Sequence, residues 1–84
     1  MILGIYGSGG LGREMYDIAL RINAETPRWE SIIFIDDVAE EGDYYDTRRI
    51  KFKSLSKVTA PLECIVAVGE PSLREKLYDR IVDA

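Results

Sequence analysis

Four glycines lie within six residues near the start of the chain, in the run Gly7-Ser8-Gly9-Gly10-Leu11-Gly12. Gly7, Gly9 and Gly12 have the G-x-G-x-x-G spacing of a loop that holds nucleotide phosphates. The first glycine permits a tight turn, the second lets backbone approach a ligand, and the third lets the next helix pack closely. Because the N–H groups that open such a helix favour an anion, this loop is predicted to bind the phosphate end of a nucleotide.

The residues among and beside these glycines leave alternatives open. Gly10 makes the loop more open still, Ser8 offers a hydroxyl, and Arg13 either adds a positive charge or is merely solvated. The glycines could also form a turn that serves close packing alone.

Acidic residues follow a second apolar segment. Asp36 and Asp37 come about two dozen residues after the glycine loop, near the place where a Rossmann unit carries a carboxylate for a ribose. One of them is expected to face the ligand, although both could simply form a turn. Two neighbours on an extended chain point in opposite directions, so no metal site is expected.

A third group of residues follows the last apolar segment. Gly69 and Glu70 end that segment, and Arg74 lies one turn into the helix that Pro71 opens. The carboxyl ends of parallel strands meet at one sheet edge, where the ligand crevice of such a sheet lies. All three groups should therefore converge, with Arg74 either reaching the crevice or remaining on the surface.

The elements that position these groups follow from periodicity. Residues 2–6, 31–35 and 64–68 are predicted to form buried strands, 49–52 a further short strand, and 40–43 a turn or mobile loop. The first helix ends by Pro27 and is expected to bury one apolar face: Leu11, Met15, Ile18, Ala19 and Ile22. The last helix repeats Leu73, Leu77 and Ile81 and is expected to continue to Ala84.

The order strand, helix, strand, then strand, helix predicts an α/β fold. We expect a small Rossmann-like, three-layer domain with a short parallel sheet of three to four strands and the first strand central. A chain of 84 residues makes one domain.

Composition excludes several classes of function. A net charge of −4 argues against a nucleic-acid binder, and no apolar run is long enough for a membrane span. The apolar start lacks the basic residues of a signal peptide. The single cysteine, Cys64, is expected to be buried, and it fits a reducing cytoplasm. With no histidine, the chain has no histidine base or metal ligand, and no catalytic residue is predicted.

Three ordered motifs resemble the N-terminal domain of bacterial sugar O- and N-acyltransferases, including the sialic-acid O-acetyltransferase and pilin-glycosylation types. They are the glycine loop continuing through Arg13-Glu14, then Phe34-Ile35-Asp36-Asp37, then Val66 to Pro71 with Arg74, and the resemblance runs from about residue 2 to 81. It implies a domain that binds a nucleotide-activated sugar, commonly a UDP-sugar. Gly7 to Gly12 would face the phosphates, Asp36 and Asp37 would lie near the nucleoside, and Gly69, Glu70 and Arg74 would form the adjoining loop.

The resemblance also implies a second domain in the parent enzyme: a left-handed β-helix that forms homotrimers, binds acetyl-CoA and carries the catalytic histidine. No hexapeptide repeat occurs between residues 1 and 84, so this chain is expected to bind without catalysing acetyl transfer, and no cofactor is expected in it. Many relatives carry histidine where Leu11 stands, so a sugar contact from that side chain is not expected here. The alternatives are an NAD-binding part of an oxidoreductase and a module that assists assembly without a ligand.

Overall fold

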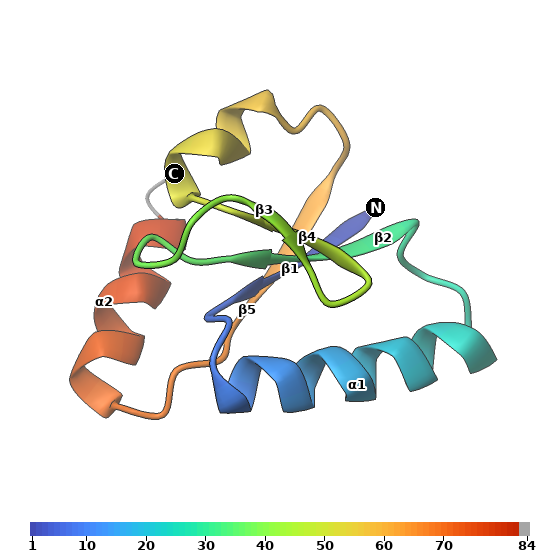
Figure 1. The fold of residues 1–84 in the computed structure, drawn as a ribbon, viewed down its shortest axis with the longest axis horizontal. Helices are drawn as coiled ribbons and strands as arrows, with labels where there is room; N and C mark the ends of the chain where they lie inside the picture. The colour runs from blue at the N-terminus through green and yellow to red at the C-terminus, as the bar shows by residue number, and fades with distance from the viewer. Residues whose placement is uncertain (83–84) are drawn as a thin grey trace.

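A mixed sheet of five strands, in the order β3-β4-β2-β1-β5, forms the centre of the computed structural model, which describes residues 1–82 (Figure 1). The elements along the chain are β1 (Ile2–Tyr6), α1 (Gly10–Glu25), β2 (Ser31–Ile35), β3 (Gly42–Tyr44), β4 (Thr47–Ile50), the 3₁₀ helix η1 (Phe52–Lys57), β5 (Leu62–Val66) and α2 (Pro71–Val82). The four strands other than β3 run parallel, which confirms the α/β, Rossmann-like class predicted from the sequence.

The strand β1 pairs with β2 on one side and β5 on the other, so it is an interior strand as predicted, although the middle position of the sheet belongs to β2. Successive side chains of β1 point to opposite faces. On one face Leu3 and Ile5 join a buried cluster with Tyr16 and Ala19 of α1. On the other face the Tyr6 ring stacks on Phe52 of η1, with centroids 5.7 Å apart. Helical segments therefore cover both faces, and Figure 1 shows α1 below the sheet and η1 above it.

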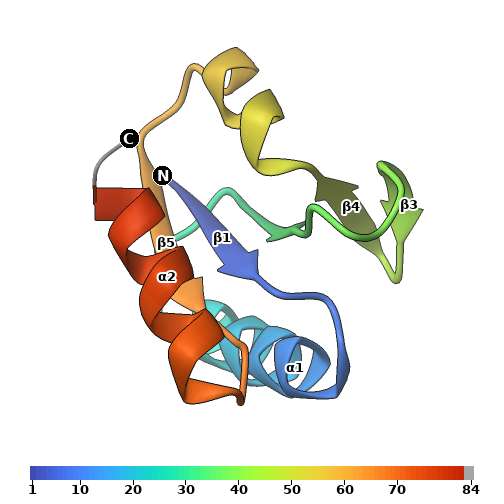
Figure 2. The same cartoon turned by 90° about the vertical axis from the view of Figure 1, so that its left-hand side faces the viewer.

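The sheet has one strand more than predicted. Residues 42–44 form β3, which pairs antiparallel with β4, where the sequence favoured a turn. This strand is short, charged and mostly exposed, so it carries no apolar alternation. Two strand positions were also wrong by two residues: β4 spans Thr47–Ile50 rather than 49–52, and β5 spans Leu62–Val66 rather than 64–68. Figure 2 shows the β3–β4 hairpin at the sheet edge opposite β5.

The buried face of α1 follows the prediction at Ala19 and at the partly buried Met15, but differs from it elsewhere. Its buried residues are Gly12, Tyr16 and Ala19, whereas Leu11, Ile18 and Ile22 are exposed. The cause lies in Gly12, which sits against the carbonyl of Gly7 and so brings the stripe through Gly12 onto the sheet. The apolar stripe beside it is left on the flank of the helix.

The strand β5 is the edge of the sheet, and all five of its residues are half-buried. The prediction of a buried strand and a buried Cys64 is therefore wrong in degree, because only β1 and the sparse packing of α2 cover it. The helix α2 ends at Val82 in the described part, and its predicted continuation to Ala84 lies outside the described residues. Neither helix of residues 1–82 combines the length and apolar character required to cross a bilayer.

Candidate functional site

Two of the loop glycines are required by the fold itself. Gly7 has a φ of +122°, and a Cβ built on it would lie 2.7 Å from the carbonyl oxygen of Ala67. A Cβ on Gly12 would overlap the carbonyl oxygen of Gly7, which is backbone and has little room to move. These glycines let the chain turn after β1 and bring the start of α1 directly against the turn.

The other two loop glycines have no such structural reason. A Cβ on Gly9 or Gly10 would have no neighbouring atom within 4 Å, and both residues are exposed. Gly9 has a φ of −79°, which any residue can adopt. A turn that serves packing alone therefore accounts for Gly7 and Gly12 but not for Gly9 and Gly10.

The first turn of α1 has no side-chain cap. Gly9 occupies the N-cap position without a side-chain hydrogen bond, and the turn contains no acidic residue. The first hydrogen bond of the helix runs from the Arg13 N–H to the Gly9 carbonyl at 2.9 Å. The N–H groups before Arg13 therefore precede the helical ladder, and they carry the positive end of the helix dipole.

Ser8 is held from three elements. Asp36 Oδ2 accepts hydrogen bonds from the Ser8 N–H at 3.2 Å and the Ser8 hydroxyl at 2.6 Å. The Tyr44 hydroxyl donates to the Ser8 carbonyl at 2.7 Å, and Arg49 Nη1 donates to the Ser8 hydroxyl at 3.4 Å. Ser8 is 5% exposed, so its contacts tie the glycine loop to the end of β2 and to the β3–β4 hairpin.

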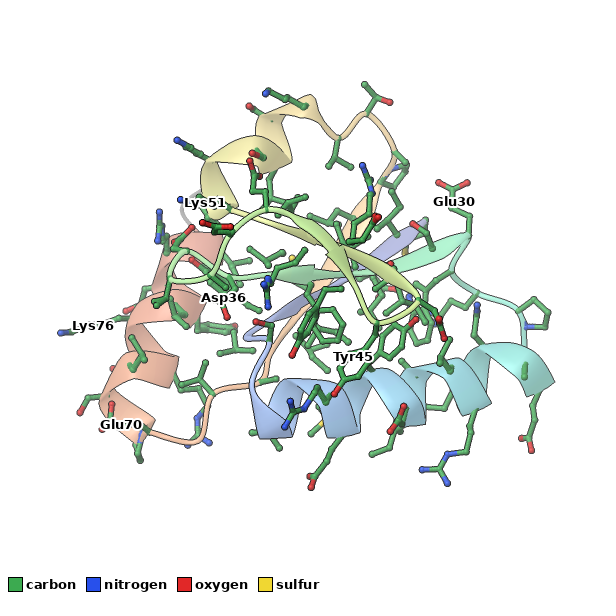
Figure 3. All side chains as sticks on the ribbon, in the orientation of Figure 1. Glu30, Asp36, Tyr45, Lys51, Glu70 and Lys76 are labelled. Carbon is green, nitrogen blue, oxygen red and sulfur yellow. The ribbon has the colours of Figure 1, made fainter. Side chains whose placement is uncertain are left out.

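Asp36 supports the loop and also begins a turn. Its Oδ1 accepts from the N–H groups of Val38 at 3.0 Å and Ala39 at 3.4 Å, while its Oδ2 is shared by the two Ser8 donors. Partial burial disfavours the charged form, but the hydrogen bonds outweigh it and lower the pKa of Asp36. Figure 3 shows Asp36 at the level of the sheet, beside the hairpin. A role in a turn, one of the two predicted for this residue, thus describes its Oδ1 contacts.

Asp37 is the centre of a second set of contacts. Its Oδ2 accepts from the Tyr6 hydroxyl at 3.0 Å and from Arg80 Nη1 at 2.6 Å, and its Oδ1 accepts from the Phe52 N–H at 2.8 Å. Burial opposes ionisation of Asp37, yet these donors lower its pKa. Burial and the Asp37 carboxylate together raise the pKa of Tyr6 to about 12. Arg80 thereby joins α2 to the ends of β1 and β2.

A cavity of about 560 Å³ opens at the carboxyl ends of β1, β2 and β5, where Figure 1 places α2 beside the strand ends. Its floor is the glycine loop, one wall is the segment after β2, and the other is α2 with the segment before it. The lining residues are Tyr6, Gly7, Ser8, Gly9, Gly10, Leu11, Asp36, Asp37, Val38, Ala67, Val68, Gly69, Leu73, Leu77 and Arg80. Members of all three predicted groups line this crevice, although the third group contributes only Gly69.

Four predicted site residues do not line this cavity. Gly12 is buried beneath the loop. Arg13 lies 6.0 Å from the Tyr45 ring, and Arg74 lines a separate groove between β5 and α2. Glu70 caps α2 by accepting from the N–H groups of Ser72 and Leu73, which lowers its pKa. Figure 3 shows Glu70 at the outer end of α2, away from Asp36.

Sequence reasoning missed the residues that α2 contributes. Leu73, Leu77 and Arg80 all line the cavity, at the spacing i, i+4 and i+7 of one helix face. That spacing was visible in the sequence, where the repeat of Leu73, Leu77 and Ile81 was given no part in the site. The structure instead leaves Leu73 exposed and Leu77 half-buried at the crevice.

The fold and this crevice define a small Rossmann-like domain whose glycine loop opens onto a cavity at the strand ends. The sequence matches the PglD N-terminal domain family over residues 2–81, and the chain belongs to that family. This is the N-terminal domain of PglD-type sugar acetyltransferases, the region of those enzymes that binds the nucleotide sugar. A comparison with curated proteins gave no match.

Proposed function

We propose that this chain binds a UDP-sugar in the crevice, as the substrate-binding domain of an acetyl-CoA-dependent sugar acetyltransferase. The observation that carries the proposal is the open space over Gly9 and Gly10. Gly9 is a favourable N-cap residue relative to alanine, but Gly10 lies within the first turn of α1, where glycine costs up to about 1 kcal/mol relative to alanine. Close approach of a ligand to the backbone gives a physical reason for that cost.

The electrostatics of the loop support the same proposal. The uncapped first turn of α1 offers backbone donors and a positive dipole to the diphosphate of a nucleotide sugar. The cavity volume of about 560 Å³ is typical of a small-molecule site. Asp36 and Ser8, by fixing the loop, would keep these donors aimed at the crevice.

The division of labour in the parent enzyme is part of the proposal. This domain would supply binding, while acetyl transfer from acetyl-CoA would occur elsewhere in the enzyme, because no histidine is present here to act as a base. We also place the domain in the cytoplasm. Cys64 is a free thiol whose pKa is raised by burial, which suits a reducing compartment.

Calorimetric titration with UDP-sugars, UDP and NAD tests the proposal. We expect binding of UDP and UDP-sugar in the micromolar to millimolar range. The variant Gly9→Val should weaken it by more than about tenfold, because the side chain would stand where the phosphate approaches. Its melting temperature should stay close to that of the parent, since a Cβ at this position meets no protein atom within 4 Å.

The matched control is Ala24→Val, which adds bulk at an exposed position of α1 away from the cavity. It should leave UDP affinity unchanged. Binding of NAD without binding of UDP would favour the oxidoreductase alternative. A folded domain that binds neither ligand would contradict the proposal and favour a role in assembly.

A further inference from the structure

Arg80 is the one cationic side chain among the described residues that line the cavity, and it shares that lining with Asp36 and Asp37. An anionic ligand that enters this crevice meets two carboxylates. Like charges a few ångströms apart near a protein surface repel one another appreciably. The positive end of α1 offsets part of it, at the glycine loop. A positive side chain on the opposite wall would therefore attract an anionic ligand and offset the remaining repulsion.

The guanidinium of Arg80 is held in place by the protein, and only part of its hydrogen-bonding capacity is used. Its Nη1 donates to Asp37 Oδ2 at 2.6 Å and to the Tyr6 hydroxyl at 3.0 Å, and its Cζ lies 4.3 Å from the Phe52 ring centroid. Within residues 1–82, Nε and Nη2 make no hydrogen bond to the protein. The side chain is 46% exposed and lines the cavity, so it is open to a ligand there.

Such an arrangement suits a phosphate better than a neutral group. A guanidinium offers planar donors that match phosphate oxygens, and charge-assisted hydrogen bonds are about twice as strong as neutral ones. Because Asp37, Tyr6 and Phe52 already fix its position, little side-chain freedom remains to be lost on binding. One edge can stay on Asp37 while the other contacts the ligand.

We propose that Arg80 is a specificity-determining residue that contacts a phosphate of the ligand from the α2 wall, opposite the glycine loop. This inference rests on the proposed function. It goes beyond it because it names a residue of the last helix that recognises the charge of the ligand. The crevice would then distinguish a nucleoside diphosphate from the uncharged nucleoside through two contacts to phosphate, one from the glycine loop and one from Arg80.

Titration of Arg80→Met with UDP and with uridine tests the assignment. Methionine keeps an unbranched stem and removes the charge. We expect UDP affinity to fall by about 10- to 100-fold, the range for a lost charge-assisted hydrogen bond. Uridine affinity should be unchanged, and the salt dependence of UDP binding should become weaker. Arg80→Lys, which keeps the charge but loses the planar donors, should retain part of the UDP affinity.

The matched control is Lys76→Met, since Lys76 is an exposed cation on the same helix and does not line the cavity. It should leave both affinities unchanged. Equal loss of UDP and uridine binding in Arg80→Met would mean that Arg80 only positions Asp37. Unchanged UDP binding would mean that Arg80 does not touch the ligand. Either result would overturn this inference but leave the proposed function standing. A parent domain that binds neither UDP nor uridine overturns the proposed function and this inference with it.

Should Arg80→Met not fold, Arg80→Lys and the salt dependence of the parent domain still decide the matter. UDP affinity that does not weaken between low and high salt would contradict an exposed cationic contact.

Discussion

The two helices of this domain meet the sheet in different ways. The helix α1 buries Gly12, Tyr16 and Ala19 against β1 and β2, each of which has four buried residues out of five. The helix α2 buries no residue, and the strand before it is half-buried throughout. The half that presents the glycine loop is therefore held by close packing, whereas the opposite wall of the crevice relies on polar contacts such as Arg80 with Asp37.

This contrast separates two tasks of a binding crevice. Backbone donors that recognise a phosphate must be fixed closely, and dense packing of β1, α1 and β2 does this. A wall that closes on the ligand has to admit it first, and few buried contacts leave such a wall in the less stable part of the fold. Substitutions in the two halves should therefore differ strongly in their effects.

The largest effect is expected at Gly12, where the packed half is tightest. Gly12→Ala should lower the free energy of unfolding by at least about 3 kcal/mol, because its methyl group would overlap the Gly7 carbonyl oxygen. In a domain of this size that loss removes much of the total stability. Circular dichroism during urea denaturation measures it.

Gly10→Ala is the control, since its added methyl group meets nothing. Its stability should be unchanged or higher by up to about 1 kcal/mol, as for glycine replacement in a helix. Similar losses for both variants would show that the loop is not held by close packing.

The two halves should also differ in how much stability is lost when a large side chain is truncated. Phe34 is completely buried and lies 5.1 Å, between ring centroids, from both Tyr16 and Tyr44. Phe34→Ala should cost about 3–5 kcal/mol, whereas Leu77→Ala, at a half-buried position of α2, should cost about 1 kcal/mol. Equal costs in the same urea titrations would contradict the difference between the halves.

The smallest effect is pH-dependent and concerns the seam between the halves, which is the set of contacts that Arg28 and Trp29 make with Glu63. Arg28 Nε and Nη2 donate to the Glu63 carboxylate at 2.8 Å each, and Trp29 Nε1 donates at 3.0 Å. These bonds lower the pKa of Glu63 from 4.5 to about 2. Because the pKa of Glu63 is lower in the folded state than in the unfolded state, its ionised carboxylate stabilises the folded domain above about pH 4.5. That stability is lost as the pH falls towards 2.

Melting temperatures recorded from pH 7 to pH 2 measure this contribution. Glu63→Gln should melt slightly lower at pH 7 and depend less on pH below 4.5 than the parent does. Because Arg28 is exposed and Glu63 only half-buried, the difference should be small. Glu14→Gln, at an exposed position of α1, should keep the parent's pH profile. A Glu63→Gln profile identical to the parent's would show that this seam carries no stability.

Much of the packed half could be predicted from the sequence, because apolar strands and a glycine loop are local signals. The boundaries of β1 and β2 and the role of Gly12 follow from them. The α2 wall could not be predicted as well. Whether Leu77 and Arg80 face a core or a crevice depends on how the last helix lies against the strand ends, and that arrangement is set by contacts distant in sequence, such as Arg80 with Tyr6.

The aspartate pair illustrates the same limit at the level of atoms. Their position at the end of β2 was predictable, but the partners of their oxygens were not. Asp36 binds Ser8 and Asp37 binds Arg80, partners that lie 28 and 43 residues away along the chain. Spacing alone places a carboxylate near a ligand; it does not reveal which of its oxygens is already used.

The seam at Glu63 has a practical consequence, because Trp29 is the only tryptophan of the chain. Its indole is half-buried against the core of the packed half and bonds to β5 of the other half. The domain thus carries an intrinsic fluorophore at the junction of its two parts. A change in tryptophan emission that precedes the loss of helical signal would report that β5 has separated while the β1–α1–β2 unit remains folded.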